Sequence, residues 1–240
     1  MVRPAACLGI AASLTLGLGE LAAQQPFGVQ RHEAVQADPD PCGKAATGLD
    51  GQIDPRLREA DSVTYRLAPE SCFQVKTGKA GLFSFAGHSH VIQARAFSGQ
   101  VVYYPKDPSR SHLAITVVAD SLEVRSPPDT AEIRKVTQAM HDDVLHTAQH
   151  HEIKLVSRRV TPAGQGFRIV AALTLVGQTR EVPIEVAIRL EGDTLRAAST
   201  FSVKQTDFGI KPYSGGPAGI VKVADRVAFD IHAVAVRSAD

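Results

Sequence analysis

Residues 173–182 read Leu-Thr-Leu-Val-Gly-Gln-Thr-Arg-Glu-Val, and this stretch decides the fold class of the chain. Two runs of strand-forming residues meet at Gly177-Gln178, a dipeptide that is typical of a tight turn. We therefore expect an antiparallel hairpin, with one strand over residues 166–176 and the next over residues 178–190.

The same pattern recurs along most of the chain. Alternating apolar and polar residues, separated by Gly, Pro or Asp, predict further strands. These strands are expected at residues 63–67, 72–76, 83–92, 94–104, 112–119, 152–160, 194–204 and 226–236. Eight or more antiparallel strands in succession favour an all-β fold, a closed up-and-down barrel. A sandwich of two sheets is the alternative.

One segment follows a different period. After the break at Pro127-Pro128, either Asp129 or Thr130 can cap the start of a helix. Apolar residues then recur every three to four positions, which predicts a helix inserted between two strands. These residues are Ile133, Val136, Met140, Val144 and Leu145.

The first residues have the pattern of an export signal. Arg3 precedes an uncharged run over residues 5–19, and small residues stand just before Gln24. The run is shorter than the roughly 20 residues that a membrane-spanning helix needs, so no stable membrane span is expected. We predict a signal peptide over residues 1–23, a linker over residues 24–61 and one barrel domain over residues 62–237, in a protein that is periplasmic or secreted.

The net charge argues against nucleic acid as a partner, and the cysteines allow one disulfide bond. The formal net charge is only +1, so the chain lacks the basic excess that nucleic-acid binding requires. Cys42 and Cys72 would meet an oxidising compartment after export, where they can form a disulfide. Two separate thiols are the alternative. The sequence also leaves a homodimer open.

Several motifs in one order resemble the YceI-like family of exported lipid-binding barrels. The resemblance covers residues 63–236. It is carried by Phe-Ser-Gly-Gln-Val at residues 97–101, Asp-Pro at 107–108, Ala-Asp-Ser-Leu at 119–122, Glu-Ile-Lys-Leu-Val-Ser at 152–157, the hairpin at 173–182 and Thr-Asp-Phe-Gly-Ile at 206–210. His151 departs from the family, which usually has Pro just before the acidic residue.

The resemblance implies a lipocalin-like barrel whose apolar channel holds an isoprenoid or another long-chain lipid. It implies no catalysis and no required cofactor, and its partner is a hydrophobic small molecule such as an isoprenoid or quinone-like lipid. Burial of methylene groups, at about 0.8 kcal/mol each, makes such a channel a good carrier. The candidate ligand-binding residues are Phe83, Phe85, His88, His90, Leu113, Ile115, Val117, Ile169, Ala171, Leu173 and Phe201.

The pair His88 and His90 sets this chain apart from the common form of the family. On the strand expected at residues 83–92, alternation puts both imidazoles on one face. They can line a polar mouth that contacts a ligand head group, or they can be structural. They can also bind a metal or haem in a redox accessory protein, with further ligands from His141, His146, His150 or His151. A hydrolase that uses Ser89 is disfavoured, because no strand–turn–helix elbow surrounds it.

Overall fold

The computed structural model describes residues 60–80, 89–125, 130–164, 166–215 and 221–238. The chain divides into two units, Met1–Gln36 and Ala37–Asp240, and all of the described residues belong to the second. The predicted signal peptide and nearly all of the predicted linker lie outside the described residues, as do Phe83, Phe85 and His88.

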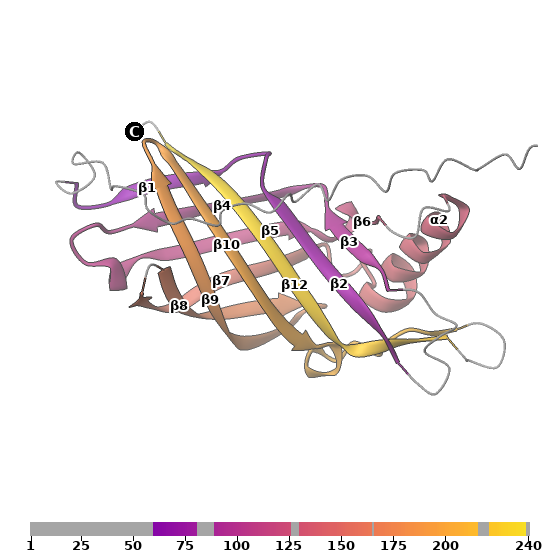
Figure 1. The fold of residues 1–240 in the computed structure, drawn as a ribbon. Helices are drawn as coiled ribbons and strands as arrows, with labels where there is room; N and C mark the ends of the chain where they lie inside the picture. Colours follow the sequence, from indigo (N-terminus) through magenta and orange to yellow (C-terminus); the bar gives the residue numbers. More distant parts are fainter. Residues whose placement is uncertain (1–59, 81–88, 126–129, 165, 216–220, 239–240) are drawn as a thin grey trace, which may run out of the picture. The chain divides into compact units, whose positions relative to one another are not determined.

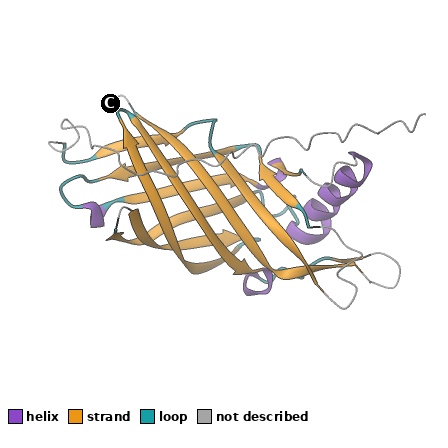
Figure 2. Cartoon of the chain, viewed as in Figure 1, coloured by secondary structure: helices purple, strands orange, loops and turns teal. Residues whose placement is uncertain are grey.

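In the described part of the chain, twelve strands form one antiparallel sheet (Figures 1 and 2). They are β1 (Val63–Leu67), β2 (Cys72–Ala80), β3 (Val91–Ala94), β4 (Phe97–Tyr103), β5 (His112–Val118), β6 (Leu122–Val124), β7 (Glu152–Ala163), β8 (Gly166–Leu175), β9 (Gln178–Glu191), β10 (Thr194–Lys204), β11 (Ser214–Gly215) and β12 (Val221–Arg237). Short 3₁₀ helices follow β4, β5 and β10, at η2 (Pro108–Arg110), η3 (Ala119–Ser121) and η5 (Gln205–Phe208).

The sheet closes on itself. The order β1-β4-β5-β7-β8-β9-β10-β12 returns to its start, because β1 pairs with both β4 and β12. Neighbours in this ring follow one another along the chain, so the barrel is of the up-and-down kind. The predicted closed barrel is confirmed, and the two-sheet sandwich is wrong.

At one end of the barrel, the sheet extends beyond the closed ring through β2, β3 and β6. β1 and β2 lie end to end along β12, with Leu67 opposite Ala235 and Cys72 opposite His232. β2 then pairs with β3, and β3 with β6. At this end of the barrel the sheet therefore continues as β12-β2-β3-β6, and β6 has no pairing with β7 among the described residues.

The strand predicted over residues 94–104 is interrupted, since β3 ends at Ala94 and β4 begins at Phe97. Ser121 holds the bend between them. Its carbonyl accepts a hydrogen bond from the Arg95 N–H at 3.0 Å, and its hydroxyl oxygen accepts one from the Ala96 N–H at 2.9 Å. The carbonyl and the hydroxyl of Ser121, which lies in η3, thus replace the ladder at this point.

The strand predicted over residues 83–92 is wrong for Ser89 and His90, because β3 begins only at Val91. His90 is instead held by Thr77: its N–H donates to the Thr77 hydroxyl at 3.1 Å, and its carbonyl accepts from the Thr77 N–H at 2.9 Å. The hydroxyl takes the place of a backbone acceptor, so the regular ladder stops here.

The hairpin at residues 173–182 forms as predicted, with its turn one residue earlier. β8 ends at Leu175 and β9 begins at Gln178, so the turn residues are Val176 and Gly177, with φ of 47° and 69°. Positive φ at both positions matches the twist of a two-residue hairpin. The strand pairing pulls Val176 into a conformation that its side chain disfavours.

The predicted helix is present between β6 and β7. α2 (Thr130–Ala139) runs into the π-helix η4 (Met140–Leu145), which ends where His146 adopts a φ of 47°. Two side chains fix this helix to β6: Thr137 accepts from the Val124 N–H at 3.2 Å, and the His141 Nε2 lies 2.9 Å from the Leu122 carbonyl. The helix thus satisfies backbone groups of a strand that lacks a neighbour on that side. Among the described residues, no helix is both long and apolar enough to cross a bilayer.

One end of the barrel interior is filled by side chains. Tyr65 and Ala235 are fully buried there, beside Tyr103, Leu190 and Leu195. Phe167 meets Tyr103 edge to face, with ring centroids 6.5 Å apart. This packed cluster lies around β1, far along the strands from α2 (Figure 1).

Gly99 on β4 lies where two backbones approach closely. A Cβ atom at this position would stand 2.7 Å from the Ala114 carbonyl oxygen and 2.9 Å from the Leu67 side chain. We expect Gly99→Ala to lower the free energy of unfolding by about 1–3 kcal/mol, because the paired strand must move to relieve the clash. Urea denaturation measures this loss.

The neighbouring exposed residue provides the control. Ser98 is exposed on the other face of β4, so Ser98→Ala should change stability by no more than about 0.5 kcal/mol. Equal stability of the two variants would contradict the close approach of β4 to β5.

Candidate ligand-binding cavity

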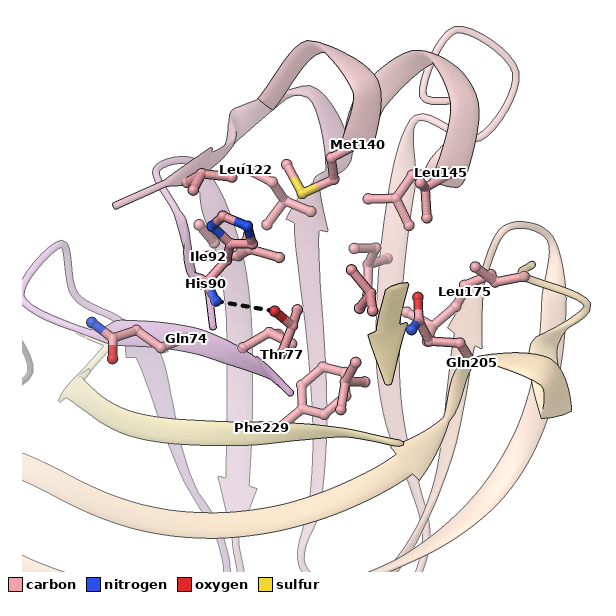
Figure 3. Close-up of a pocket in the computed structure, with 18 of the residues that line it drawn as sticks. Gln74, Thr77, His90, Ile92, Leu122, Met140, Leu145, Leu175, Gln205 and Phe229 are labelled. Carbon is pink, nitrogen blue, oxygen red and sulfur yellow. Dashed lines mark hydrogen bonds between the residues drawn. The ribbon is translucent and has the colours of Figure 1, made fainter. Parts of the chain in front are cut away.

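A cavity of about 430 Å³ lies inside the barrel at the end that α2 covers (Figure 3). This volume falls within the range of about 300–1,000 Å³ that is usual for small-molecule sites. The lining is mostly aliphatic and aromatic, and it is drawn from β2, β3, β5, β6, β7, β8, β10 and β12, from α2 and from η4. The cavity can therefore bury an apolar molecule.

Strand periodicity produces this lining. Because successive side chains of a strand point to opposite faces, every second residue points into the barrel. The pairs and triplets that line the cavity in this way are Phe73, Val75 and Thr77; Ile92 and Ala94; Ile115 and Val117; Leu122 and Val124; Ile153 and Leu155; Leu173 and Leu175; Phe201 and Val203; and Val227, Phe229 and Ile231.

The helical segment closes one side of the cavity. Its apolar face contributes Val136, Ala139, Met140, Val144 and Leu145. In Figure 3 the labelled side chains of Met140 and Leu145 point from the helix towards the strands. Hydrogen bonds between β6 and the side chains of Thr137 and His141 hold this face in place.

Two aromatic rings stack across the cavity wall. Phe201 on β10 lies directly opposite Phe229 on β12, with ring centroids 4.7 Å apart and an angle of 1° between the planes. Both side chains line the cavity and are only partly buried. They present a flat apolar surface to whatever enters.

The few polar residues of the lining are Gln74, Thr77, His90, Glu132, Lys135, Gln205, Tyr213 and Lys222. Gln205 is engaged already, because its amide donates to the Ala224 carbonyl at 2.9 Å. Gln74 points away from the other labelled side chains in Figure 3. A small number of polar groups in an apolar site is the usual means of orienting a ligand.

Some of the residues predicted from sequence line this cavity, and others do not. His90, Ile115, Val117, Leu173 and Phe201 line it. Leu113, Ile169 and Ala171 do not, although each lies on the same strand face as a neighbour that does. They sit further along their strands, where the interior is packed. Whether any of these residues contacts a ligand stays a prediction.

Sequence comparison identifies the family. The model of the YceI-like domain matches residues 52–235, which is more than half of the chain. The chain belongs to the YceI-like family. No curated protein matches the sequence.

Solved structures support the same fold for this YceI-like chain. BcnA of Burkholderia cenocepacia is 19% identical, with a TM-score of 0.53 over 68% of this chain and 95% of that one. A polyisoprenoid binding domain from Saccharophagus degradans, implicated in plant cell wall breakdown, is 14% identical, with a TM-score of 0.50 over 73% of this chain and 99% of that one. At these identities the likeness concerns the fold alone.

The histidines do not gather into one cluster in the described part of the YceI-like chain. No group of three or more His, Cys, Asp or Glu there could hold a metal. His141 is bound to the Leu122 carbonyl. His146 and His150 do not share a helical face, because the helix ends before His146. Since His88 lies outside the described residues, metal binding by His88 and His90 remains a hypothesis.

Many lining residues were not named from the sequence, among them Val75, Leu155, Leu175 and Val203. The signal that could have found them is the one that found Ile115 and Val117, alternation within a strand. The lining residues of the helix had a signal too, because their spacing marked an apolar face. The sequence did not show how far along the barrel axis each residue lies.

Cys72 is disulfide-bonded. The other cysteines, Cys7 and Cys42, lie outside the described residues, so the pairing with Cys42 stays a prediction. Cys72 lies on β2 next to Phe73, which lines the cavity.

A carboxylate anchors η5 against β12 at the edge of the cavity. Asp225 accepts hydrogen bonds from the Thr206 N–H at 2.9 Å and the Thr206 hydroxyl at 2.8 Å. The backbone hydrogen bond is the main reason why the pKa of Asp225 is held below its ordinary value of 3.8. The anchor positions η5, which carries Gln205 into the lining and buries Phe208.

The anchor predicts a dependence on pH. Because the folded-state pKa of Asp225 is depressed, its contribution is present above the ordinary pKa and is lost as the pH falls through the folded-state value. We expect NMR titration to give a pKa below 3.8, and Thr206→Val to raise it, since one donor to the carboxylate is removed. An unchanged pKa in Thr206→Val would show that the hydroxyl makes no contribution.

Proposed function

We propose that this YceI-like chain is a non-catalytic binding protein that holds an isoprenoid or another long-chain lipid inside its barrel, in the periplasm or outside the cell. The observation that carries the proposal is the apolar cavity of about 430 Å³. Its walls are side chains of a closed barrel, and the packed cluster around Tyr65 and Tyr103 lies beyond its floor.

The physical argument is the insolubility of the ligand. Each methylene that leaves water contributes about 0.8 kcal/mol, so a chain of several isoprene units gains enough to offset the loss of its translational and conformational freedom. Within a closed barrel the backbone groups of paired strands are satisfied by one another, and the interior surface can be almost entirely apolar. The lining described above has this character.

Two further observations support the proposal. A structural neighbour from Saccharophagus degradans is described as a polyisoprenoid binding domain. The disulfide at Cys72 suits an oxidising compartment, as does the export signal read from residues 1–23. A carrier that buries the lipid is useful in such an aqueous compartment, because free isoprenoid chains aggregate in water.

The direct test is native mass spectrometry of the mature protein from the periplasm or medium of the producing cells, with organic extraction of bound molecules. The proposal expects an isoprenoid or other long-chain lipid at near one molecule per chain. A protein that is empty, and that also fails to take up added geranylgeraniol, would overturn it.

Filling the cavity should displace the ligand. Ala139 lines the cavity from α2, so Ala139→Trp would occupy space that a lipid chain needs. We expect the affinity for geranylgeraniol, measured by competition with a fluorescent prenyl probe, to fall at least about tenfold, equivalent to about 1.4 kcal/mol.

Gln138→Trp is the matched control. Gln138 is the preceding residue of the same helix, is exposed and does not line the cavity. It adds the same indole to α2 and should leave affinity within about twofold. If the two tryptophan variants bind geranylgeraniol equally, the lipid does not occupy this cavity.

A further inference from the structure

We propose that the ligand of this barrel is an anionic amphiphile, whose phosphate or carboxylate head group binds at the rim of the cavity between Lys135 on α2 and Lys222 on β12. The inference rests on the proposed function, since it takes the apolar cavity as the site of the tail. It goes beyond that function because it assigns the charge of the head group and the residues that select it.

Two ammonium groups at the cavity are available to a ligand. Lys135 and Lys222 both line the cavity and are both exposed. Within the described part of the chain neither has an ion-pair or hydrogen-bond partner. Two other lysines are engaged: Lys76 is 2.7 Å from the Asp230 carboxylate, and Lys154 is 2.7 Å from the Glu152 carboxylate. The two lysines of the lining, in contrast, have no counter-ion among the described residues.

The lining holds one carboxylate, Glu132, three residues before Lys135 on α2. Glu132 already takes part in an interaction of its own. With Lys135 and Lys222 present, the charged side chains of the lining still sum to a positive value. An anion at the rim is thus favoured over a cation or a neutral group of equal size.

The hairpin of β11 and β12 adds a neutral donor beside Lys222. Ser214 lies opposite Lys222 in this pairing, and the Val223 N–H donates to the Tyr213 carbonyl at 3.0 Å. The Tyr213 ring lies over Gly215, where any side chain would collide with it. Glycine at this position therefore lets the Tyr213 phenol lie at the cavity, where it can donate a hydrogen bond.

Thr77 on β2, the strand that pairs with β12, supplies a second hydroxyl. Its oxygen accepts the His90 N–H at 3.1 Å, as the dashed line in Figure 3 shows. That bond uses a lone pair and leaves the hydroxyl proton to be donated. The Thr77 side chain faces the cavity between His90 and Phe229 in Figure 3, so a head-group oxygen is a suitable acceptor.

Because Lys135 and Lys222 are both exposed, the head group would bind them at the surface. Both ammonium groups remain in water, so binding an anion does not require the burial of an unpaired charge. The tail enters the apolar interior while the head group stays at the rim. The affinity gained from the head group should consequently weaken as ionic strength increases, whereas the affinity gained from the tail should not.

Three ligands with the same tail test the inference: geranylgeraniol, geranylgeranoate and geranylgeranyl phosphate, each titrated against the mature protein at low and at physiological ionic strength. We expect at least one anionic ligand to bind about tenfold more tightly than the alcohol at low salt, with the difference shrinking as salt is added. Whether the phosphate or the carboxylate binds more tightly identifies the source of the head group.

Two double variants test whether Lys135 and Lys222 cause the preference for an anionic ligand. Lys135→Gln combined with Lys222→Gln should abolish the preference for the anion and leave the affinity for geranylgeraniol within about twofold. Arg134→Gln combined with Lys211→Gln is the control: both residues are exposed, neither lines the cavity, and the change in net charge is the same. The control pair should keep the preference.

Several results would overturn the inference. Equal affinities of the native protein for all three ligands would refute an anionic head group, although the proposed function would stand. Loss of the preference in the control pair as well would assign it to net charge and not to the rim. Failure of all three ligands to bind would overturn the proposed function together with this inference.

Discussion

The pairing of β12 with β1 is the constraint on which the rest of the molecule depends. β12 lies along β10 over eleven residue pairs and along β1 and β2 on its other edge, so the last strand of the chain joins the ends of the sheet. Closure removes the exposed edges of an open sheet. It also turns one face of every strand into a shared interior, which is the condition for any internal cavity in this fold.

The barrel interior is packed with side chains at one end and hollow at the other, and the hollow end forms the candidate site. Around Tyr65 and Tyr103 the inward side chains meet and fill the barrel. At the other end the sheet continues from β12 through β2 and β3 to β6, which pairs with no further strand in the described part of the chain, and α2 with η4 lines the cavity there. The helix is bonded to β6 through Thr137 and His141, so the roof of the cavity is fixed to its wall.

Local signals predicted much of this architecture. The hairpin at residues 173–182 and the helix after Pro128 depend on turn chemistry and on periodicity, both of which act over a few residues. The bend at Arg95-Ala96 and the loss of strand at His90 had no such signal, because their hydrogen-bond partners are Ser121 and Thr77, distant in the chain. Groups from a distant part of the chain that replace ladder bonds cannot be recognised before the strands are placed.

The sequence by itself determined which residues face inward, because a strand alternates its side chains with a period of two whatever it packs against. Only the tertiary structure decided which inward residues meet a hollow. Ile169, Ala171 and Leu173 share one face of β8, yet only Leu173 reaches the cavity. Lys135 and Lys222 likewise line one cavity from distant elements. The position of the empty volume depends on how the strands and the helix pack together, so no single segment determines it.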